Sequence, residues 1–96
     1  TTRMVDAEEA LRIGLVNQVV EKGQEKEASL TMLKTIAEKA PIAVAKTIQC
    51  INAYYDKNID GFEEEAKQFG LCMETEDFKE GTSAFIEKRK PTFKNK

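Results

Sequence analysis

Apolar residues recur every three or four positions over most of this chain, which is the spacing of one face of an α-helix. Glycines, prolines and capping residues interrupt the pattern and divide it into separate segments. The expected helices cover residues 6–13, 24–39, 41–56, 61–73 and 76–89. We therefore predict an all-α fold, a small bundle of about five helices.

Local signals mark the ends of these helices. Asp6, Asp60 and Thr75 each precede acidic residues, so each is expected to cap a helix whose first turn carries charges that complement the helix dipole. Gly14 is placed to end the first helix in the left-handed conformation, and Pro41 separates the second helix from the third. The boundaries thus follow from side chains close to each end.

We expect the apolar sides of the helices to be buried, and residues 15–20 to be extended because they are few and partly β-branched. The apolar positions form a one-face stripe of Val44, Ile48, Ile51 and Tyr55 in the third helix, a buried face of Phe62, Ala66, Phe69 and Met73 in the fourth, and inside positions Phe78, Phe85 and Ile86 in the fifth; of Tyr54 and Tyr55, one can pack while the other meets solvent.

Composition indicates one small domain, residues 1–96, with 41% hydrophobic and 33% charged residues and a formal net charge of -2. No apolar run approaches the ~20 residues that cross a bilayer, so we expect a cytoplasmic protein without a membrane partner. The chain has no histidine, which excludes Ser-His-Asp triads and histidine-ligated metal sites.

The remaining chemical groups have structural interpretations. Cys50 and Cys72 form no C-x-x-C motif, which favours small buried side chains in a reducing compartment over a redox or metal site. The acidic clusters lie in or next to first helical turns, where the helix dipole explains them without a catalytic acid/base pair. We expect no metal site.

Five of the chain's 15 basic residues lie in its last nine positions, close to Phe85 and Phe93. One interpretation is a helix end followed by a frayed, solvated tail. The other is an anion site, for which an acidic chain with a pI of about 5.3 makes nucleic acid a poor partner. A compact ligand fits better, with a flat ring on Phe85 and a phosphate on Lys88 or Arg89.

Three motifs, in order, resemble the enoyl-CoA hydratase (crotonase) family. Residues 4–17 resemble its D-A-x-x-A-x-x-x-G-L-V-N segment, and residues 39–44 resemble its A-P-x-A-V link. Residues 69–91 are similar to its closing T-E-D-x-x-E-G-x-x-A-F-x-E-K-R-x-P signature. The match covers nearly the whole chain and departs at Thr2, where the family usually has glycine.

The resemblance implies that the chain is the C-terminal oligomerisation domain of a crotonase-like fold. In that family an N-terminal spiral domain supplies two catalytic glutamates and the oxyanion hole, so we expect a fragment without catalytic residues and without activity of its own. The parent would be a lyase that adds water to a 2-enoyl-CoA or removes it from a 3-hydroxyacyl-CoA. Coenzyme A thioester would be the substrate, with no tightly bound cofactor.

The resemblance also implies individual roles. Phe85 and Lys88 match residues that approach the adenine and 3′-phosphate end of coenzyme A, usually on a neighbouring subunit. Phe69 matches a position lining the acyl-tail channel, although core packing explains a helical phenylalanine equally well. The implied partners are acyl-CoA and copies of the chain: trimers or hexamers in the parent, a dimer or domain exchange in the fragment. A stand-alone helical interaction module and the terminal domain of an enoyl-CoA isomerase remain alternatives.

Overall fold

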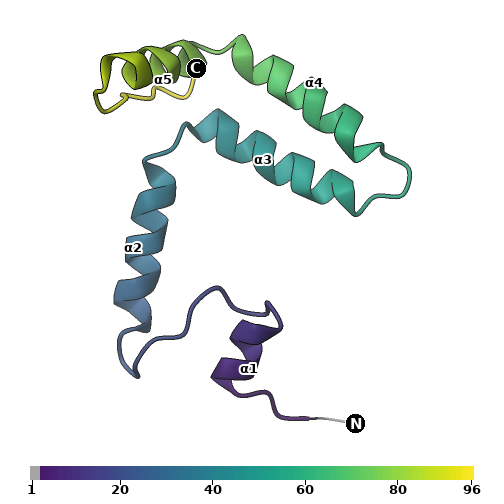
Figure 1. Cartoon of the computed structure of the whole chain (residues 1–96), viewed down its shortest axis with the longest axis vertical. Helices are drawn as coiled ribbons and strands as arrows, with labels where there is room; N and C mark the ends of the chain where they lie inside the picture. The colour runs from purple at the N-terminus through teal and green to yellow at the C-terminus, as the bar shows by residue number, and fades with distance from the viewer. Residues whose placement is uncertain (1–2) are drawn as a thin grey trace. The chain divides into compact units, whose positions relative to one another are not determined.

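The computed structural model describes residues 3–96, which contain five α-helices and no strand, so the predicted all-α class is confirmed (Figure 1). Each helix begins within one residue of its predicted start and ends at or within two residues of its predicted end. The family departure at Thr2 lies outside the described residues. The helices are α1 (Ala7–Arg12), α2 (Glu25–Ala37), α3 (Pro41–Tyr54), α4 (Gly61–Met73) and α5 (Glu76–Glu87).

The predicted caps are confirmed. Asp6, Asp60 and Thr75 accept hydrogen bonds from first-turn backbone N–H groups of α1, α4 and α5. Gly14 has a φ of +78° after α1, and Pro41 is the first residue of α3. A side-chain cap stabilises a helix by about 1 kcal/mol, which is why residues near each end are enough to set a boundary.

The chain forms two compact units, one up to Lys34 and one from Thr35 onward. In the first unit, the N–H groups of Leu15 and Val16 both donate to the Ala10 carbonyl, at 2.8 and 3.3 Å, and this turns the chain sharply after α1. Residues 15–20 belong to no helix or strand. The segment predicted to be extended is therefore a connection between helices.

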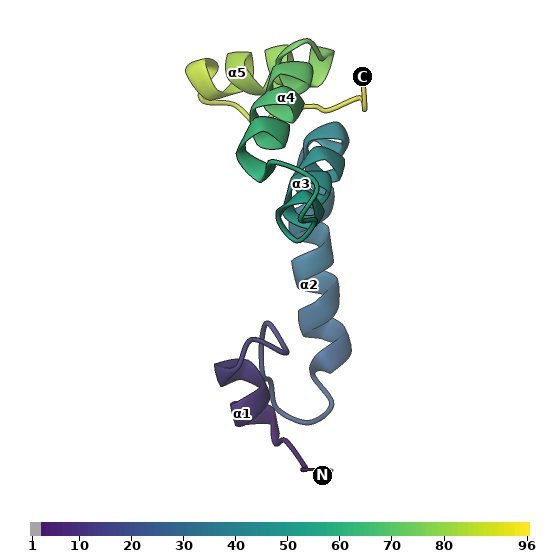
Figure 2. The same ribbon diagram turned by 90° about the vertical axis from the view of Figure 1, so that its right-hand side faces the viewer.

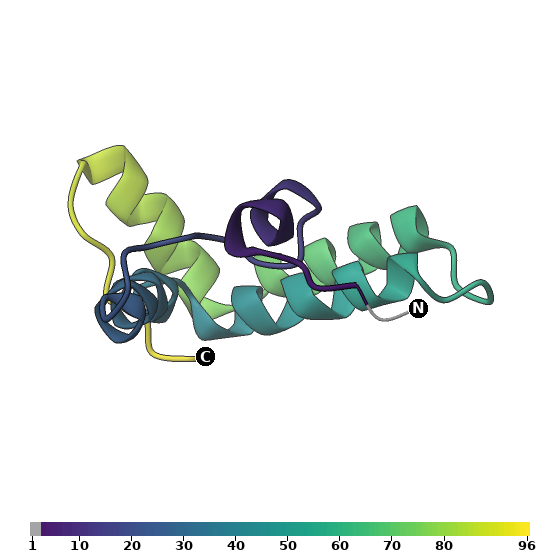
Figure 3. The same cartoon turned by 90° about the horizontal axis from the view of Figure 1, so that it is seen from below.

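In the second unit, α3 and α4 run antiparallel beside each other, as Figure 3 shows, and α5 packs on α4 after a short turn. A polar link joins the pair: the amides of Gln49 and Gln68 both donate to Glu64 Oε1, at 2.9 and 2.6 Å. Within residues 3–96, no helix is long and apolar enough to span a membrane.

The predicted burial of the large apolar side chains is wrong for most positions. The buried apolar residues of the described chain are Ala10, Ala53 and Ala84, whereas Phe62 and Phe85 are each 85% exposed. Helix α3 packs on α4 and α4 packs on α5, so most of each apolar stripe has no element over it. The other residues of the predicted apolar stripes that lie exposed are Ile48, Ile51, Tyr55, Ala66, Phe69, Met73 and Ile86.

Candidate functional site

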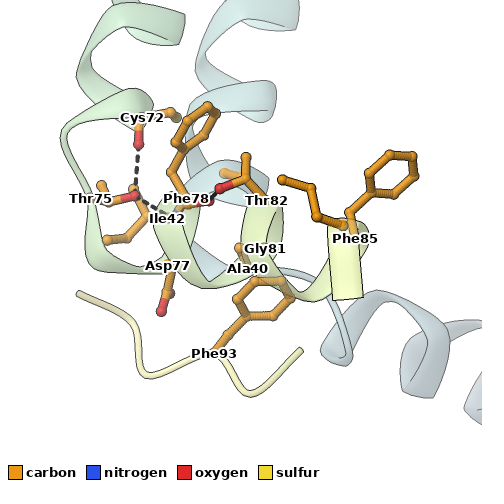
Figure 4. Close-up of a pocket in the computed structure, with 12 residues that line it drawn as sticks. Ala40, Ile42, Cys72, Thr75, Asp77, Phe78, Gly81, Thr82, Phe85 and Phe93 are labelled. Atoms are coloured by element: carbon orange, nitrogen blue, oxygen red, sulfur yellow. Dashed lines mark hydrogen bonds between the residues drawn. The ribbon is translucent and has the colours of Figure 1, made fainter. Parts of the chain in front are cut away.

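An apolar pocket of about 410 Å³ lies in the second unit, between the start of α3, the end of α4, helix α5 and the C-terminal tail (Figure 4). The tail, residues 88–96, closes one side through Phe93. A Cβ atom built on Gly81 would lie 3.4 Å from Phe93 Cε1, an ordinary van der Waals contact, so the ring packs directly over this position of α5. The pocket is lined by Ala40, Ile42, Ala43, Cys72, Thr75, Asp77, Phe78, Gly81, Thr82, Phe85, Ile86 and Phe93.

Helix α5 ends at Lys88, which adopts a left-handed conformation with φ 55° and ψ 41°. The Arg89 N–H donates to the Ala84 carbonyl at 3.0 Å, and the Lys88 N–H donates to the Phe85 carbonyl at 3.3 Å. This pair of bonds defines a Schellman motif, whose left-handed position is most often glycine. The turn reverses the chain, and Figure 2 shows the tail following α5 back toward its start.

Glu80 holds the first part of the tail. Its carboxylate makes two contacts with the Arg89 guanidinium, 2.6 Å to Nη1 and 3.0 Å to Nη2, and accepts the Thr92 N–H at 2.9 Å. These contacts, the Arg89 hydrogen bond first, lower the pKa of Glu80 to about 2. Arg89 also pairs with Glu87 at 2.6 Å, and both carboxylates raise the pKa of its guanidinium. The Arg89 guanidinium is therefore committed, in the sense that its charge is already paired within the chain.

Asp77 holds the second part of the tail. Its two carboxylate oxygens accept the N–H groups of Lys94 and Asn95, at 2.7 and 2.9 Å, and its own N–H donates to the Lys96 carbonyl at 2.9 Å. The residue is only 2% exposed. The interpretation of residues 88–96 as a frayed, solvated tail is therefore wrong, because its backbone bonds to α5.

The structure separates the basic residues that the sequence grouped together. Lys90 pairs with Glu38 at 3.0 Å, which lowers the pKa of that carboxyl. The Lys88 ammonium is exposed and makes no hydrogen bond or ion pair with the described part of the chain. Of the two phosphate candidates, Lys88 and Arg89, only Lys88 has an uncommitted charge.

The predicted ligand residues are only partly brought together. Phe85 and Lys88 lie three positions apart at the end of α5, and Phe85 lines the pocket. Phe69 belongs to α4, is 60% exposed and does not line this pocket. Among residues 3–96 no group of three histidine, cysteine or acidic side chains is arranged to hold a metal ion.

Sequence reasoning missed the roles of Asp77 and Glu80. Asp77 was assigned to the helix dipole because it lies in the first turn of α5. Glu80 lies beyond that turn, so the dipole does not explain it, and its partner Arg89 follows nine residues later. A mid-helix acid, followed nine residues later by an arginine two positions before a proline, is the signal that would have indicated the Glu80 clamp, the contacts of Glu80 with Arg89 and Thr92.

Comparison with solved structures defines the class of fold. The chain superposes on a crystal structure of an enoyl-CoA hydratase from Geobacillus kaustophilus HTA426 with a TM-score of 0.86 and 33% sequence identity. The match covers 96% of this chain and 35% of that one. The fold is therefore that of a helical part of an enoyl-CoA hydratase.

Sequence comparison gives the family. The model described as enoyl-CoA hydratase/isomerase matches residues 1–96, and the chain belongs to that family. It is 45% identical to the short-chain-enoyl-CoA hydratase of Clostridium acetobutylicum, covering 100% of this chain and 38% of the relative. It is 35% identical to the methylmalonyl-CoA decarboxylase of Escherichia coli K12, covering 97% of this chain and 37% of the relative. The chain thus spans less than two-fifths of the length of these relatives.

Proposed function

We propose that this chain is the part of an enoyl-CoA hydratase that completes the adenine and phosphate end of the coenzyme A pocket and contributes to self-association. The observation that carries the proposal is the pairing, at the end of α5, of the exposed Phe85 ring with the uncommitted Lys88 charge. The ring offers a face for adenine, and the ammonium offers charge-assisted hydrogen bonds to a phosphate.

The reaction of the whole protein follows the relatives in this proposal. It hydrates a 2-enoyl-CoA, or dehydrates a 3-hydroxyacyl-CoA, without a tightly bound cofactor. The named relatives include a hydratase and a decarboxylase, so the hydratase assignment rests on the 45% identical relative and the superposed structure. In the family the catalytic glutamates belong to a spiral domain, and this chain supplies no catalytic residue in the proposal.

Self-association is supported by the exposed apolar residues. Phe62 and Phe85 are each 85% exposed, and side chains of this size seldom lie uncovered in large numbers unless the surface contacts another chain or a ligand. In this proposal the exposed Phe69 side chain lines the acyl-tail channel.

The two free cysteines, Cys50 and Cys72, support a reducing compartment such as the cytoplasm.

Isothermal titration calorimetry of the 96-residue chain with coenzyme A and with dephospho-coenzyme A tests the proposal. The second ligand lacks only the 3′-phosphate. We expect about fivefold tighter binding of coenzyme A, corresponding to roughly 1 kcal/mol for an exposed charge pair. Lys88→Met should abolish this preference, whereas Lys57→Met, in the α3–α4 connection, should keep it.

Equal binding of both ligands by the wild-type chain, or no binding, would contradict the phosphate role of Lys88. The absence of a catalytic residue is checked separately with crotonyl-CoA. The chain alone should give no hydration above background, and clear turnover would contradict that part of the proposal.

A second candidate function, a stand-alone helical interaction module, is favoured by the same exposed apolar faces. It differs from the first in needing no ligand at Phe85 and Lys88. Loss of self-association on substitution of Phe62, combined with equal affinity for the two coenzyme A forms, would favour the module. An isomerase reaction is a third alternative, because the matching family model is described as hydratase/isomerase.

A further inference from the structure

Lys88 has a backbone conformation that lysine rarely adopts. It is one of two non-glycine residues with positive φ in the described part of the chain, the other being Asn95. A residue stays in such a conformation only when its surroundings hold it there. The groups that hold the turn therefore also decide where the Lys88 side chain is presented.

We infer that Glu80 is a positioning residue: it binds the residues that follow Lys88 and thereby fixes the turn at Lys88 for phosphate recognition. Glu80 binds the Arg89 guanidinium at 2.6 and 3.0 Å and the Thr92 N–H at 2.9 Å. On the helix side, the Lys88 N–H donates to the Phe85 carbonyl at 3.3 Å. The backbone is thus held on both sides of Lys88.

Asp77 secures the remainder of the tail and keeps Thr92 within reach of Glu80. Its carboxylate bonds the N–H groups of Lys94 and Asn95, and the residue is almost fully buried. Removing a buried acceptor leaves its donors without partners, which opposes tail docking. The two acids thus hold successive parts of the tail: Glu80 binds the part next to the turn at Lys88, and Asp77 binds the part next to the C-terminus.

The charge of Glu80 argues against direct recognition of the ligand. A carboxylate repels a phosphate, so Glu80 can favour phosphate binding only by fixing geometry. Its negative charge is also matched by Arg89, and the neighbouring Lys94 further offsets it. The positioning role rests on the proposed function, because it requires that Lys88 meets the 3′-phosphate of coenzyme A.

The test compares two affinities for each variant of the 96-residue chain. The measured quantity is the Kd of dephospho-coenzyme A divided by the Kd of coenzyme A. We expect Glu80→Gln to reduce this ratio to less than half of the wild-type value, because Lys88 is no longer held toward the phosphate. The matched control is Glu76→Gln on the same helix, since the Glu76 side chain is exposed and makes no hydrogen bond or ion pair within residues 3–96. The control should keep the wild-type ratio.

The ratio separates positioning from loss of fold. If a variant merely lowers the fraction of folded chain, both apparent Kd values rise by the same factor and their ratio stays constant. Arg89→Lys gives a second test with a smaller expected effect, because lysine keeps the charge but cannot make the bidentate contact with Glu80. It should give a ratio between those of Glu80→Gln and the wild type. Adding Glu80→Gln to Lys88→Met should not change the ratio further.

A wild-type preference for coenzyme A that Lys88→Met abolishes but Glu80→Gln leaves intact would overturn only the positioning role. A larger ratio in Glu80→Gln would overturn it as well, because it would show that the carboxylate opposes the phosphate. Equal affinity of the wild-type chain for both ligands, or no binding, would overturn the phosphate role of Lys88 and the positioning role together.

Discussion

Lys88 combines a charge suited to a phosphate with a backbone conformation suited to glycine. Its φ of 55° places its Cβ close to the following carbonyl oxygen, a strain of roughly 1–2 kcal/mol for a residue with a side chain. Glycine at this position would avoid the strain but provide no ammonium. The lysine therefore trades stability for a charge at the end of α5, which supports a functional role for its side chain.

Lys88→Gly is expected to make the chain more stable and less selective. Removing the side chain relieves the left-handed strain, so the free energy of unfolding in urea should rise by about 1 kcal/mol. The preference for coenzyme A over dephospho-coenzyme A should disappear in the same variant. Lys79→Gly is the matched control, because Lys79 lies inside α5, where glycine should lower stability by about 1 kcal/mol. Lower stability of Lys88→Gly would contradict the strain.

At the scale of elements, two acids hold α5 and the tail together. Asp77 and Glu80 lie on α5 and bond backbone N–H groups of residues 92–95. The tail in turn carries Phe93, which closes one side of the apolar pocket. Changes in either acid should therefore affect the pocket as well as the turn at Lys88.

The Glu80 clamp should persist at acid pH. Its folded-state pKa of about 2 lies below its ordinary value of 4.5, chiefly because of the Arg89 hydrogen bond. A carboxyl group with a lowered pKa contributes stability above the unfolded-state pKa and loses it as pH falls through the folded-state value. The difference in unfolding free energy between wild type and Glu80→Gln should be constant above about pH 5 and shrink between about pH 4.5 and 2. Urea titrations across this range measure it.

Glu76→Gln is the control for this pH series, because the Glu76 side chain makes no hydrogen bond or ion pair within residues 3–96 and its removal breaks no contact with the tail. A wild-type advantage over Glu80→Gln that stays the same down to about pH 2 would mean that the ionised carboxylate is not the group that holds the tail.

At the scale of the whole molecule, the main feature is apolar surface without a cover. Phe62, Phe69 and Phe85 are all more than half exposed, as are Ile48 and Ile51. The helical periodicity that places these residues on one side is the usual pattern of a buried face. A chain of this composition with so little buried apolar surface is expected to use these faces for contacts beyond itself.

Sedimentation velocity should show concentration-dependent association of the 96-residue chain in the micromolar range. Phe62→Glu is expected to shift it toward monomer, because a charge on a contact face opposes burial. Lys57→Ser, in the exposed α3–α4 connection, should leave the association unchanged. A monomer at all concentrations, with a cooperative thermal transition, would argue that these faces need no partner.

The sequence by itself determined the helices, their boundaries and the family. Asp6, Asp60, Thr75 and Pro41 act on backbone groups within a few residues, so their effects can be predicted from neighbours in the chain. The ordered motifs identified the family that the comparisons then established. Phe85 and Lys88 lie three residues apart at the end of α5, and their role toward a ligand stays a prediction.

Only the tertiary structure decided which charges are available and which apolar residues are covered. The sequence alone offers Lys88 and Arg89 as alternative phosphate-binding residues. In the structure Glu80 forms an ion pair with Arg89, whereas the Lys88 ammonium has no charged partner among residues 3–96. Asp77 reaches Lys94 and Asn95 across 17 and 18 residues because the chain reverses at Lys88, where a lysine stands in place of the glycine that would signal a turn. Burial likewise depends on which elements face each other. The periodicity of the sequence shows which side of a helix is apolar, but it does not show whether another element packs on that side.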